Sequence, residues 1–347
     1  MAEQPVSEPT HEINIDRQVD IPMRDGTILR ADVYRPVTPG RYPVIVERVA
    51  YELDYRVGPY ASFFAERGYV FVGQNVRGTF WSEGEFDPGN EGSSERQDGY
   101  DTIEWVASQP WSNGRVGTMD GSQSGFTQYA LAPTRPPHLT AMFVRSGDSS
   151  FYMSGAFTPG GVQVDRRIDM IDSLLIASRH ESSPDGGEMM IRPLEAALSN
   201  PRSIHEHLPL RENPSVPKDG PGTLRWLLQT VDHPDYDDFW ARANPASMLH
   251  EADVPIFHLS GWFDVLLPGA LTSFGIVRES GHSEFARENQ HLLVGPWIHG
   301  EFAADEQSAG ELEFGPDVPI GLNEFRLRWF DHWLNEPRSD VSGLPKV

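Results

Sequence analysis

A short turn rich in glycine and serine, residues 121–125, joins an apolar strand to an apolar helix. The strand is expected over residues 116–119 and the helix over residues 125–132. A buried strand that turns sharply into a helix is typical of a parallel sheet covered by helices. Apolar strands alternate with helical segments from residue 44 up to this turn. The alternation predicts an α/β fold, a mostly parallel sheet with helices on both faces.

The turn also suggests chemistry, because it resembles the G-x-S-x-G elbow that presents a nucleophilic serine. Its middle position holds Gln123, so the nucleophile has to be sought one residue to either side. The strained elbow requires small residues two positions from its centre. Ser122 at the centre places Ser124 there, whereas Ser124 at the centre would place Phe126 there. We therefore predict Ser122 as the nucleophile.

A serine nucleophile needs a histidine base and a carboxylate that orients the base. Asp264 follows an apolar strand over residues 254–259, and His299 follows another over residues 291–294. In α/β-hydrolases the three groups occur in the order serine, acid, histidine, each just past a strand. The chain has this order, which predicts a triad of Ser122, Asp264 and His299.

Other histidines are interpreted differently. His258 lies within a strand and is expected to be a hydrogen-bonded core residue. The pair His205 and His207 resembles a metal motif but has no third ligand at helical spacing. We expect no metal and no cofactor.

Taken together, the residues resemble the CocE/NonD (cocaine-esterase-like) family of α/β-hydrolases, relatives of X-prolyl dipeptidyl peptidases and α-amino-acid ester hydrolases. The resemblance spans almost the whole chain outside residues 150–240. Its motifs are at residues 23–26, 31–36, 76–78, 82–86, 98–105, 121–125, 261–264 and 295–299. It implies that Ser122, Asp264 and His299 form the triad.

The resemblance also implies an oxyanion hole, a pair of donors for the charge that develops on the substrate oxygen. Gln123 would supply its backbone N–H, which any residue but proline provides. Tyr51, just past a strand over residues 43–48, would supply its hydroxyl. The alternative is that Tyr51 or the neighbouring Tyr55 only packs the loop.

The chain departs from the family in four places. Gln123 stands where tyrosine is common, Ala50 where proline is common, and Asp120 where the elbow has a small residue. The chain stops soon after a helix expected over residues 321–335, so the β-jelly-roll domain of the family is expected to be absent.

Three regions follow from this pattern. Residues 1–149 are expected to form the first part of the core, opening with a β-hairpin around Asp25 and Gly26. Residues 150–240 are expected to form an inserted helical cap, and residues 241–347 the second part of the core. Helices of the cap are predicted over residues 165–178, 189–198 and 224–231. Four cap methionines could line an acyl pocket, but at helical spacing they are more often core: Met153, Met170, Met189 and Met190.

The substrate class follows from one segment. Val265 to Pro268, directly after Asp264, are apolar and suit an uncharged acyl or aryl group better than an ammonium. A carboxylic ester is therefore favoured, with amide or X-prolyl peptide cleavage as the alternative. A noncatalytic binding protein of hydrolase fold is the alternative from another class. The residues predicted to line the substrate pocket are Phe126, Leu266, Trp262 and Trp297.

Composition limits the partners. The 347 residues carry a formal charge of −23, which opposes binding to nucleic acid or to an anionic membrane. There is no cysteine, no apolar run of about 18 residues, and no basic, apolar start typical of a secretory signal. We expect a cytoplasmic enzyme that acts on small molecules. An apolar patch left by the missing domain would favour homo-oligomers.

Overall fold

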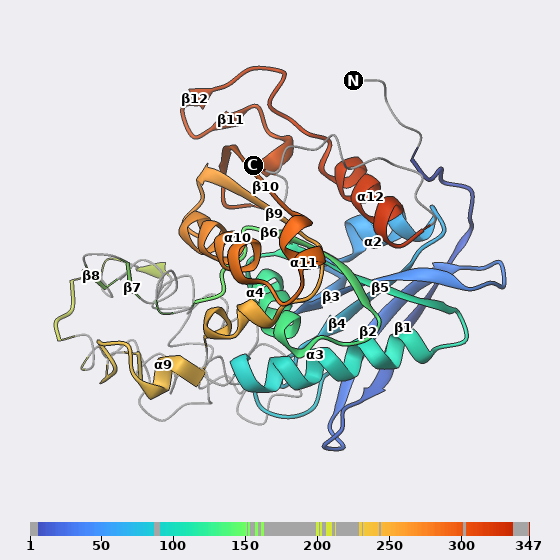
Figure 1. Ribbon diagram of the computed structural model, residues 1–347, viewed down its shortest axis with the longest axis horizontal. Helices are drawn as coiled ribbons and strands as arrows, with labels where there is room; N and C mark the ends of the chain where they lie inside the picture. Colours follow the sequence, from blue (N-terminus) through green and yellow to red (C-terminus); the bar gives the residue numbers. More distant parts are fainter. Residues whose placement is uncertain are drawn as a thin grey trace.

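The computed structural model of the chain describes residues 6–86, 91–150, 152, 157–158, 161–162, 199–200, 202, 206–209, 212, 229–230, 232–242, 244–300, 303–335 and 347. Within them, eight strands form one sheet in the order β1-β2-β4-β3-β5-β6-β9-β10 (Figure 1). Their bounds are β1 Ile13–Pro22, β2 Ile28–Pro36, β3 Tyr42–Val49, β4 Val70–Asn75, β5 Ser112–Gly121, β6 Leu139–Arg145, β9 Ile256–Phe263 and β10 Gln290–Ile298.

The predicted opening hairpin and the predicted parallel sheet are both confirmed. β1 pairs antiparallel with β2, and β2 antiparallel with β4. All later neighbours in the sheet, from β4 through β10, run parallel. Parallel strands end at the same edge, so the residues that follow β3, β5, β6, β9 and β10 are brought together. This carboxyl edge faces the side of β7, β8 and α9 in Figure 1.

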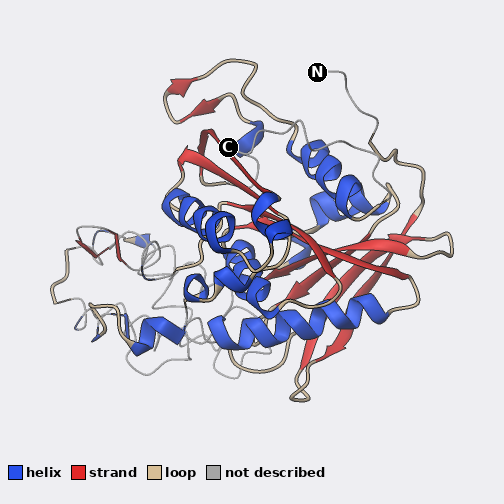
Figure 2. Cartoon of the chain, in the orientation of Figure 1, coloured by secondary structure: helices blue, strands red, loops and turns tan. Residues whose placement is uncertain are grey.

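Helices cover both faces of the sheet (Figure 2). They are α1 Leu53–Arg56, α2 Gly58–Ala65, α3 Glu91–Ser108, α4 Gln123–Leu131, α10 Leu267–Ser280, α11 Glu284–Glu288 and α12 Leu322–Trp333. Successive strand residues point to opposite faces, which divides the core in two. Ile45 packs with residues of α1, α2 and α12, whereas its neighbours Val44 and Val46 pack with residues of α3.

Helix α12 shows how one glycine permits close packing. A side chain at Gly117 of β5 would place its Cβ 2.7 Å from the ring of Phe330, so only glycine allows the helix to approach this strand. Phe330 and Trp329 are fully buried there. Burial of one such side chain stabilises the fold by about 1.5–3 kcal/mol. The helix expected over residues 321–335 is thereby confirmed.

Strand β6 is absent from the strands expected above. Its residues, Leu139–Arg145, form a short apolar run in which periodicity alone cannot separate a strand from a buried helix. Its position between β5 and β9 therefore comes from the tertiary structure.

The predicted cap falls mostly outside the described residues. This is true of the helices expected over residues 165–178 and 189–198, and of residues 224–231 except the helical pair 229–230. The described parts include a two-stranded ladder, β7 Phe157–Thr158 with β8 Gly161–Val162, and helix α9 Asp238–Arg242. The domain boundaries stay predictions.

Candidate active site

The turn after β5 has the backbone of a nucleophile elbow. Ser122 has φ of 59° and ψ of −124°, and α4 begins at the next residue. Few residues other than glycine adopt a positive φ, and such strain is typical of functional sites. A Cβ at Gly121 would lie 2.0 Å from the carbonyl oxygen of Arg145, and one at Gly125 would lie 2.8 Å from Gly147 Cα. Glycine is therefore required on both sides of Ser122.

The two serines of the turn differ in their surroundings. Ser122 is partly exposed, whereas Ser124 is fully buried within α4. The Ser124 hydroxyl donates a hydrogen bond of 2.8 Å to Glu47 Oε1 of β3. Ser124 is thus committed to a buried contact, which agrees with the choice of Ser122 as the residue that can reach a substrate.

Asp264 and His299 come together at the ends of neighbouring strands. Phe263 of β9 is the register partner of Ile298 of β10, so the residues that follow them leave the sheet side by side. His299 Nδ1 lies 3.0 Å from Asp264 Oδ1. The Asp264 side chain is fully buried, while that of His299 is 32% exposed. The predicted acid and base are therefore in contact.

The environment of Asp264 keeps its carboxylate ionised. Burial alone would raise the pKa of Asp264, but the hydrogen bond with His299 and the electrostatic interaction with it act in the opposite direction. The Ser146 hydroxyl and the Leu266 N–H, which donates a bond of 2.8 Å to Oδ1, lower the pKa further. The net pKa is below the ordinary value. An ionised Asp264 accepts from His299 Nδ1–H, which leaves the Nε2 lone pair available for a proton.

Ser122 lies at the same edge of the sheet, two strand positions away from β9. Its N–H donates to the carbonyl of Ser146, at 3.0 Å, and to that of Arg145, at 3.2 Å. Among the described residues, no hydrogen bond joins Ser122 Oγ to His299. In ligand-free hydrolases this contact is often long and closes only when the substrate is bound. The triad therefore remains a prediction that the edge geometry supports.

A buried cluster of charges lies beneath the elbow, and sequence analysis missed most of it. Asp120 accepts from Arg145 at 3.0 Å, from Arg326 of α12 at 2.9 Å and from Tyr60 at 2.7 Å, and it pairs with Arg56 at 3.2 Å. Asp120 itself has φ of 87°. Burial would raise the pKa of Asp120, but the positive charges of the arginines hold it well below the ordinary value.

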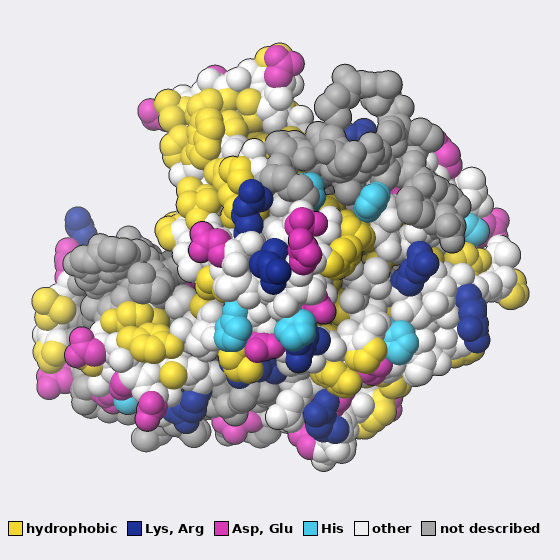
Figure 3. Space-filling model, in the orientation of Figure 1, with side chains coloured by type: hydrophobic (Ala, Val, Ile, Leu, Met, Phe, Trp, Pro, Cys, Tyr) yellow, Lys and Arg dark blue, Asp and Glu magenta, His cyan; other side chains and the backbone are white. Residues whose placement is uncertain are grey.

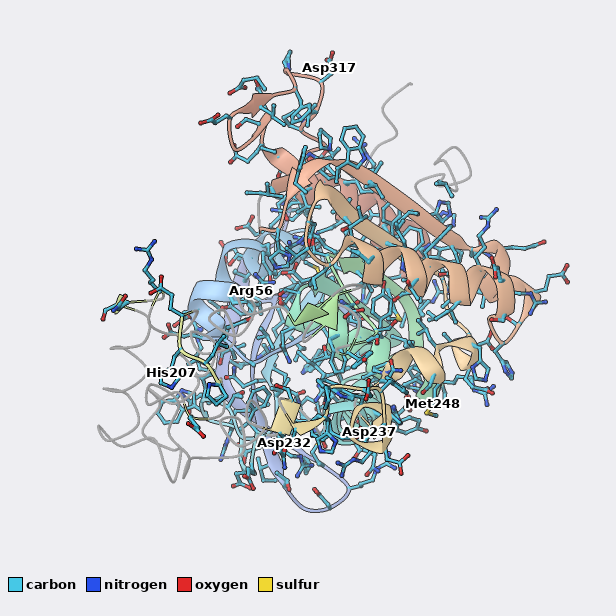
Figure 4. All side chains as sticks on the ribbon, turned by 90° about the vertical axis from the view of Figure 1, so that its left-hand side faces the viewer. Arg56, His207, Asp232, Asp237, Met248 and Asp317 are labelled. Atoms are coloured by element: carbon cyan, nitrogen blue, oxygen red, sulfur yellow. The ribbon has the colours of Figure 1, made fainter. Side chains whose placement is uncertain are left out.

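This cluster explains why an aspartate stands where the elbow usually has a small residue. Arg145 joins Asp120 to the loop of the predicted base, because its Nη1 donates a bond of 2.6 Å to the carbonyl of Gly300, next to His299. Arg56 lies on the pale blue helix in Figure 4, which views the carboxyl edge. The sequence did contain a signal for this cluster, because Asp120 is a charged residue inside an apolar strand. A charged residue is almost never fully buried unless it is paired.

The predicted oxyanion residues lie at adjacent strand ends. Tyr51 follows β3, and its carbonyl accepts a bond of 2.8 Å from Asn75 Nδ2. Arg56 lies over the Tyr51 ring, 6.0 Å from its centroid. Gln123 is the first residue of α4, so its N–H points out of the helix N-terminus, where anions are stabilised.

The residues predicted to line a substrate pocket differ in their exposure to solvent. Phe126 and Leu266 are buried. Trp297 is also buried, and a Cβ at Gly295 would lie 2.5 Å from its indole, which places it in the core. Trp262 is instead 57% exposed. A substrate-binding role for any of them stays a prediction.

An exposed apolar surface lies beside the site. Trp262 and Phe263 each contact the ring of Phe314, at centroid distances of 6.4 and 6.0 Å. Leu312 of β12 (Leu312–Glu313), two residues before Phe314, is also exposed, and hydrophobic atoms gather over the β11–β12 region in Figure 3. β11 is Ser308–Ala309. Association of copies through this surface stays a prediction.

The described part of the chain contains neither a metal-binding cluster nor a membrane-spanning helix. No group of three or more His, Asp or Glu residues there is arranged to hold a metal ion. Of the pair that resembles a metal motif, His207 is described and His205 is not. No helix there is long and apolar enough to span a bilayer.

A mostly parallel eight-stranded sheet, a strained serine elbow and a paired acid and histidine at the carboxyl edge define an α/β-hydrolase. The sequence profile described as X-Pro dipeptidyl-peptidase (S15 family) matches residues 25–301. The chain belongs to this family, and the predicted family resemblance is confirmed.

Individual relatives agree with this assignment. The cocaine esterase of Rhodococcus sp. (strain MB1 Bresler) is 28% identical over 348 residues, which cover 96% of this chain and 57% of the relative. Two solved structures share the fold. An aminopeptidase from a marine sediment archaeon, Thaumarchaeota archaeon, has a TM-score of 0.72 at 21% identity, covering 99% of this chain and 58% of its own. An α-amino acid ester hydrolase has a TM-score of 0.70 at 22% identity, covering 100% and 57%.

The chain therefore spans a little over half the length of these relatives.

Proposed function

We propose that the chain hydrolyses carboxylic esters through an acyl-enzyme on Ser122. The observation that carries this proposal is the buried carboxylate of Asp264 held 3.0 Å from His299 Nδ1, at the sheet edge where Ser122 adopts its strained backbone. A carboxylate, an imidazole and a hydroxyl gathered at one edge are the groups that acyl transfer requires.

In the first half of the reaction, Ser122 Oγ attacks the ester carbonyl carbon while His299 Nε2 takes the hydroxyl proton. The carbonyl electrons move onto oxygen, and this oxyanion accepts hydrogen bonds from the Gln123 N–H and the Tyr51 hydroxyl. Asp264 stabilises the imidazolium that forms. When the intermediate collapses, the C–O bond to the alcohol breaks and His299 returns its proton to the leaving oxygen.

In the second half, water takes the place of the alcohol. His299 removes a proton from the water as its oxygen attacks the acyl carbon, and a second oxyanion forms in the same hole. The bond to Ser122 Oγ then breaks, and Oγ receives the proton from His299. The carboxylic acid is released, and the free enzyme is restored with all atoms accounted for.

An uncharged acyl or aryl group fits the chemistry of the edge. Val265, Leu266 and Leu267 follow Asp264 directly and offer no carboxylate to an ammonium group. The second candidate is amide or X-prolyl peptide cleavage, which the description of the matching family profile favours. A p-nitrophenyl ester series compared with an X-Pro p-nitroanilide separates these two activities.

The deciding experiment is labelling of the 347-residue chain with a fluorophosphonate probe. We expect stoichiometric labelling of the parent chain and of Ser124→Ala, and none of Ser122→Ala. Ester turnover should follow the same pattern. A folded parent chain that neither labels nor turns over ester would support the alternative of a noncatalytic binding protein.

A further inference from the structure

The side chain of Gln123 connects two loops that are far apart in sequence. The Ala50 N–H donates a hydrogen bond of 3.0 Å to Gln123 Oε1, across 73 residues. Ala50 is 6% exposed and Gln123 is half-buried, so this bond is only partly accessible to water. A hydrogen bond that is partly shielded from water holds its partners more firmly than a fully exposed one.

Ala50 is the residue between β3 and Tyr51. The loop is also held from its other side, because Asn75 Nδ2 donates to the carbonyls of Val49, at 3.4 Å, and Tyr51, at 2.8 Å. The backbone of three consecutive residues is thereby fixed. Of these contacts, only the one from Ala50 reaches the elbow itself.

A role in helix stability does not account for Gln123. The residue starts α4, but its amide oxygen accepts from another loop and caps no N–H of its own helix. Its Nε2 is buried and has no hydrogen-bond partner among the described residues. A buried donor without a partner costs stability, so an apolar side chain of similar length would serve packing better.

We propose that the Gln123 side chain is a positioning residue that fixes the distance between the two oxyanion donors. One donor is the N–H of Gln123 itself, and the other is the hydroxyl of Tyr51, one residue beyond the anchored Ala50. This inference rests on the proposed function. An oxyanion hole stabilises the transition state only if its donors stay about 2.7–3.1 Å from the oxyanion, so a loosened loop lowers kcat more than it raises KM.

The first test is a set of side-chain variants at position 123, all of which keep the backbone N–H. Gln123→Met removes the acceptor at nearly constant length, and we expect kcat for a p-nitrophenyl ester to fall roughly 10- to 100-fold with little change in KM. Gln123→Glu keeps an acceptor for the Ala50 N–H, so its kcat should lie above that of Gln123→Met although its negative charge opposes the developing oxyanion. Gln109→Met, at a similarly half-buried glutamine remote from the site, is the matched control and should match the parent chain.

The second test removes the same hydrogen bond from its other end. Ala50→Pro deletes the donor, and Ala50→Gly keeps it as a control. Val49 ends a strand, so its extended backbone is compatible with a following proline. If the hydrogen bond positions Tyr51, the losses in kcat caused by Gln123→Met and Ala50→Pro should not add in the double variant.

Affinity for a boronic acid, which forms a tetrahedral adduct with serine, gives a readout that a purely structural role would not move. We expect it to weaken in parallel with kcat while the midpoint of thermal unfolding changes little. Unchanged kcat in Gln123→Met, or additive losses in the double variant, would overturn the inference. Absence of fluorophosphonate labelling in the parent chain would overturn the proposed function instead.

Discussion

Two buried aspartates at the carboxyl edge, Asp120 and Asp264, show how the same side chain serves different ends. Asp120 contacts three arginines and a tyrosine, whereas the ionisable partner of Asp264 is one partly exposed histidine, beside the Ser146 hydroxyl and the Leu266 N–H. The pKa of each is lowered against the effect of burial. Arginine stays charged at all relevant pH values, but histidine gains and loses its proton near neutrality. The cluster around Asp120 therefore keeps its charges at all relevant pH values, whereas the pair of Asp264 and His299 can exchange a proton.

The largest expected effect comes from Asp264→Asn. The amide can no longer hold His299 in the tautomer that leaves Nε2 free, so we expect kcat for an ester to fall by about 10⁴-fold. Stability should change little by comparison, because no charged group other than His299 loses its partner. Steady-state kinetics measure the fall in kcat, and urea unfolding of the same preparation measures the change in stability. A variant that stays active would remove Asp264 from the mechanism.

Next in size is Asp120→Asn, for which we expect a large loss of stability and a smaller loss of activity. Three arginines would lose the carboxylate they surround, and breaking a buried ion pair from one side costs about 3–5 kcal/mol. We expect the free energy of unfolding, measured by urea titration, to fall by this amount. If the chain folds, fluorophosphonate labelling of Ser122 should persist at a reduced rate. Unchanged stability would show that the cluster does not stabilise the fold.

A third prediction compares His258 with His299. His258 is fully buried between Tyr129 at 2.7 Å and Gln290 at 3.1 Å, as expected for a core residue. Gln290 Nε2 donates to the carbonyls of Val254 and Ala286, so its Oε1 faces His258 and accepts from Nε2–H. The ring is thus held neutral, and burial lowers the pKa of His258 from 6.5 to about 4.

The sign of the pH effect follows from proton binding. Between pH 6.5 and 4 the unfolded chain binds a proton at His258 that the folded chain does not, so stability falls as pH falls through this window. From pH 7 to pH 4.5 the loss amounts to about 2 to 3 kcal/mol. Unfolding by urea at the two pH values should show this loss in the parent chain and a smaller one in His258→Gln. Equal losses would contradict the assignment.

The smallest effect is expected from Ser124→Ala, which separates the two serines of the elbow. The variant deletes a hydrogen bond to the buried carboxylate of Glu47, a loss of about 1.5–3 kcal/mol in stability. Ester kcat should stay within a few fold of the parent value, because the Ser124 hydroxyl is fully buried and bonded to Glu47. A loss of kcat as large as that of Ser122→Ala would contradict the choice of Ser122 over Ser124 as the nucleophile.

Much of the site could be derived from local sequence. The turn at 121–125, and Asp264 and His299 just past apolar strands, each depend on a few neighbouring residues. Strand periodicity, glycine at a close approach and a polar residue at a strand end are properties of short segments. In a parallel sheet all such ends meet at one edge, so local patterns were sufficient to gather these groups.

Other features depended on the tertiary structure alone. Arg326 reaches Asp120 across 206 residues, and Gln123 reaches Ala50 across 73. β6 enters the sheet between β5 and β9 although its own residues favour no single element. Sequence patterns specify the local backbone and which faces are buried. The partner of a buried charge or amide is set by the strand order and by the packing of distant helices, which no short segment encodes.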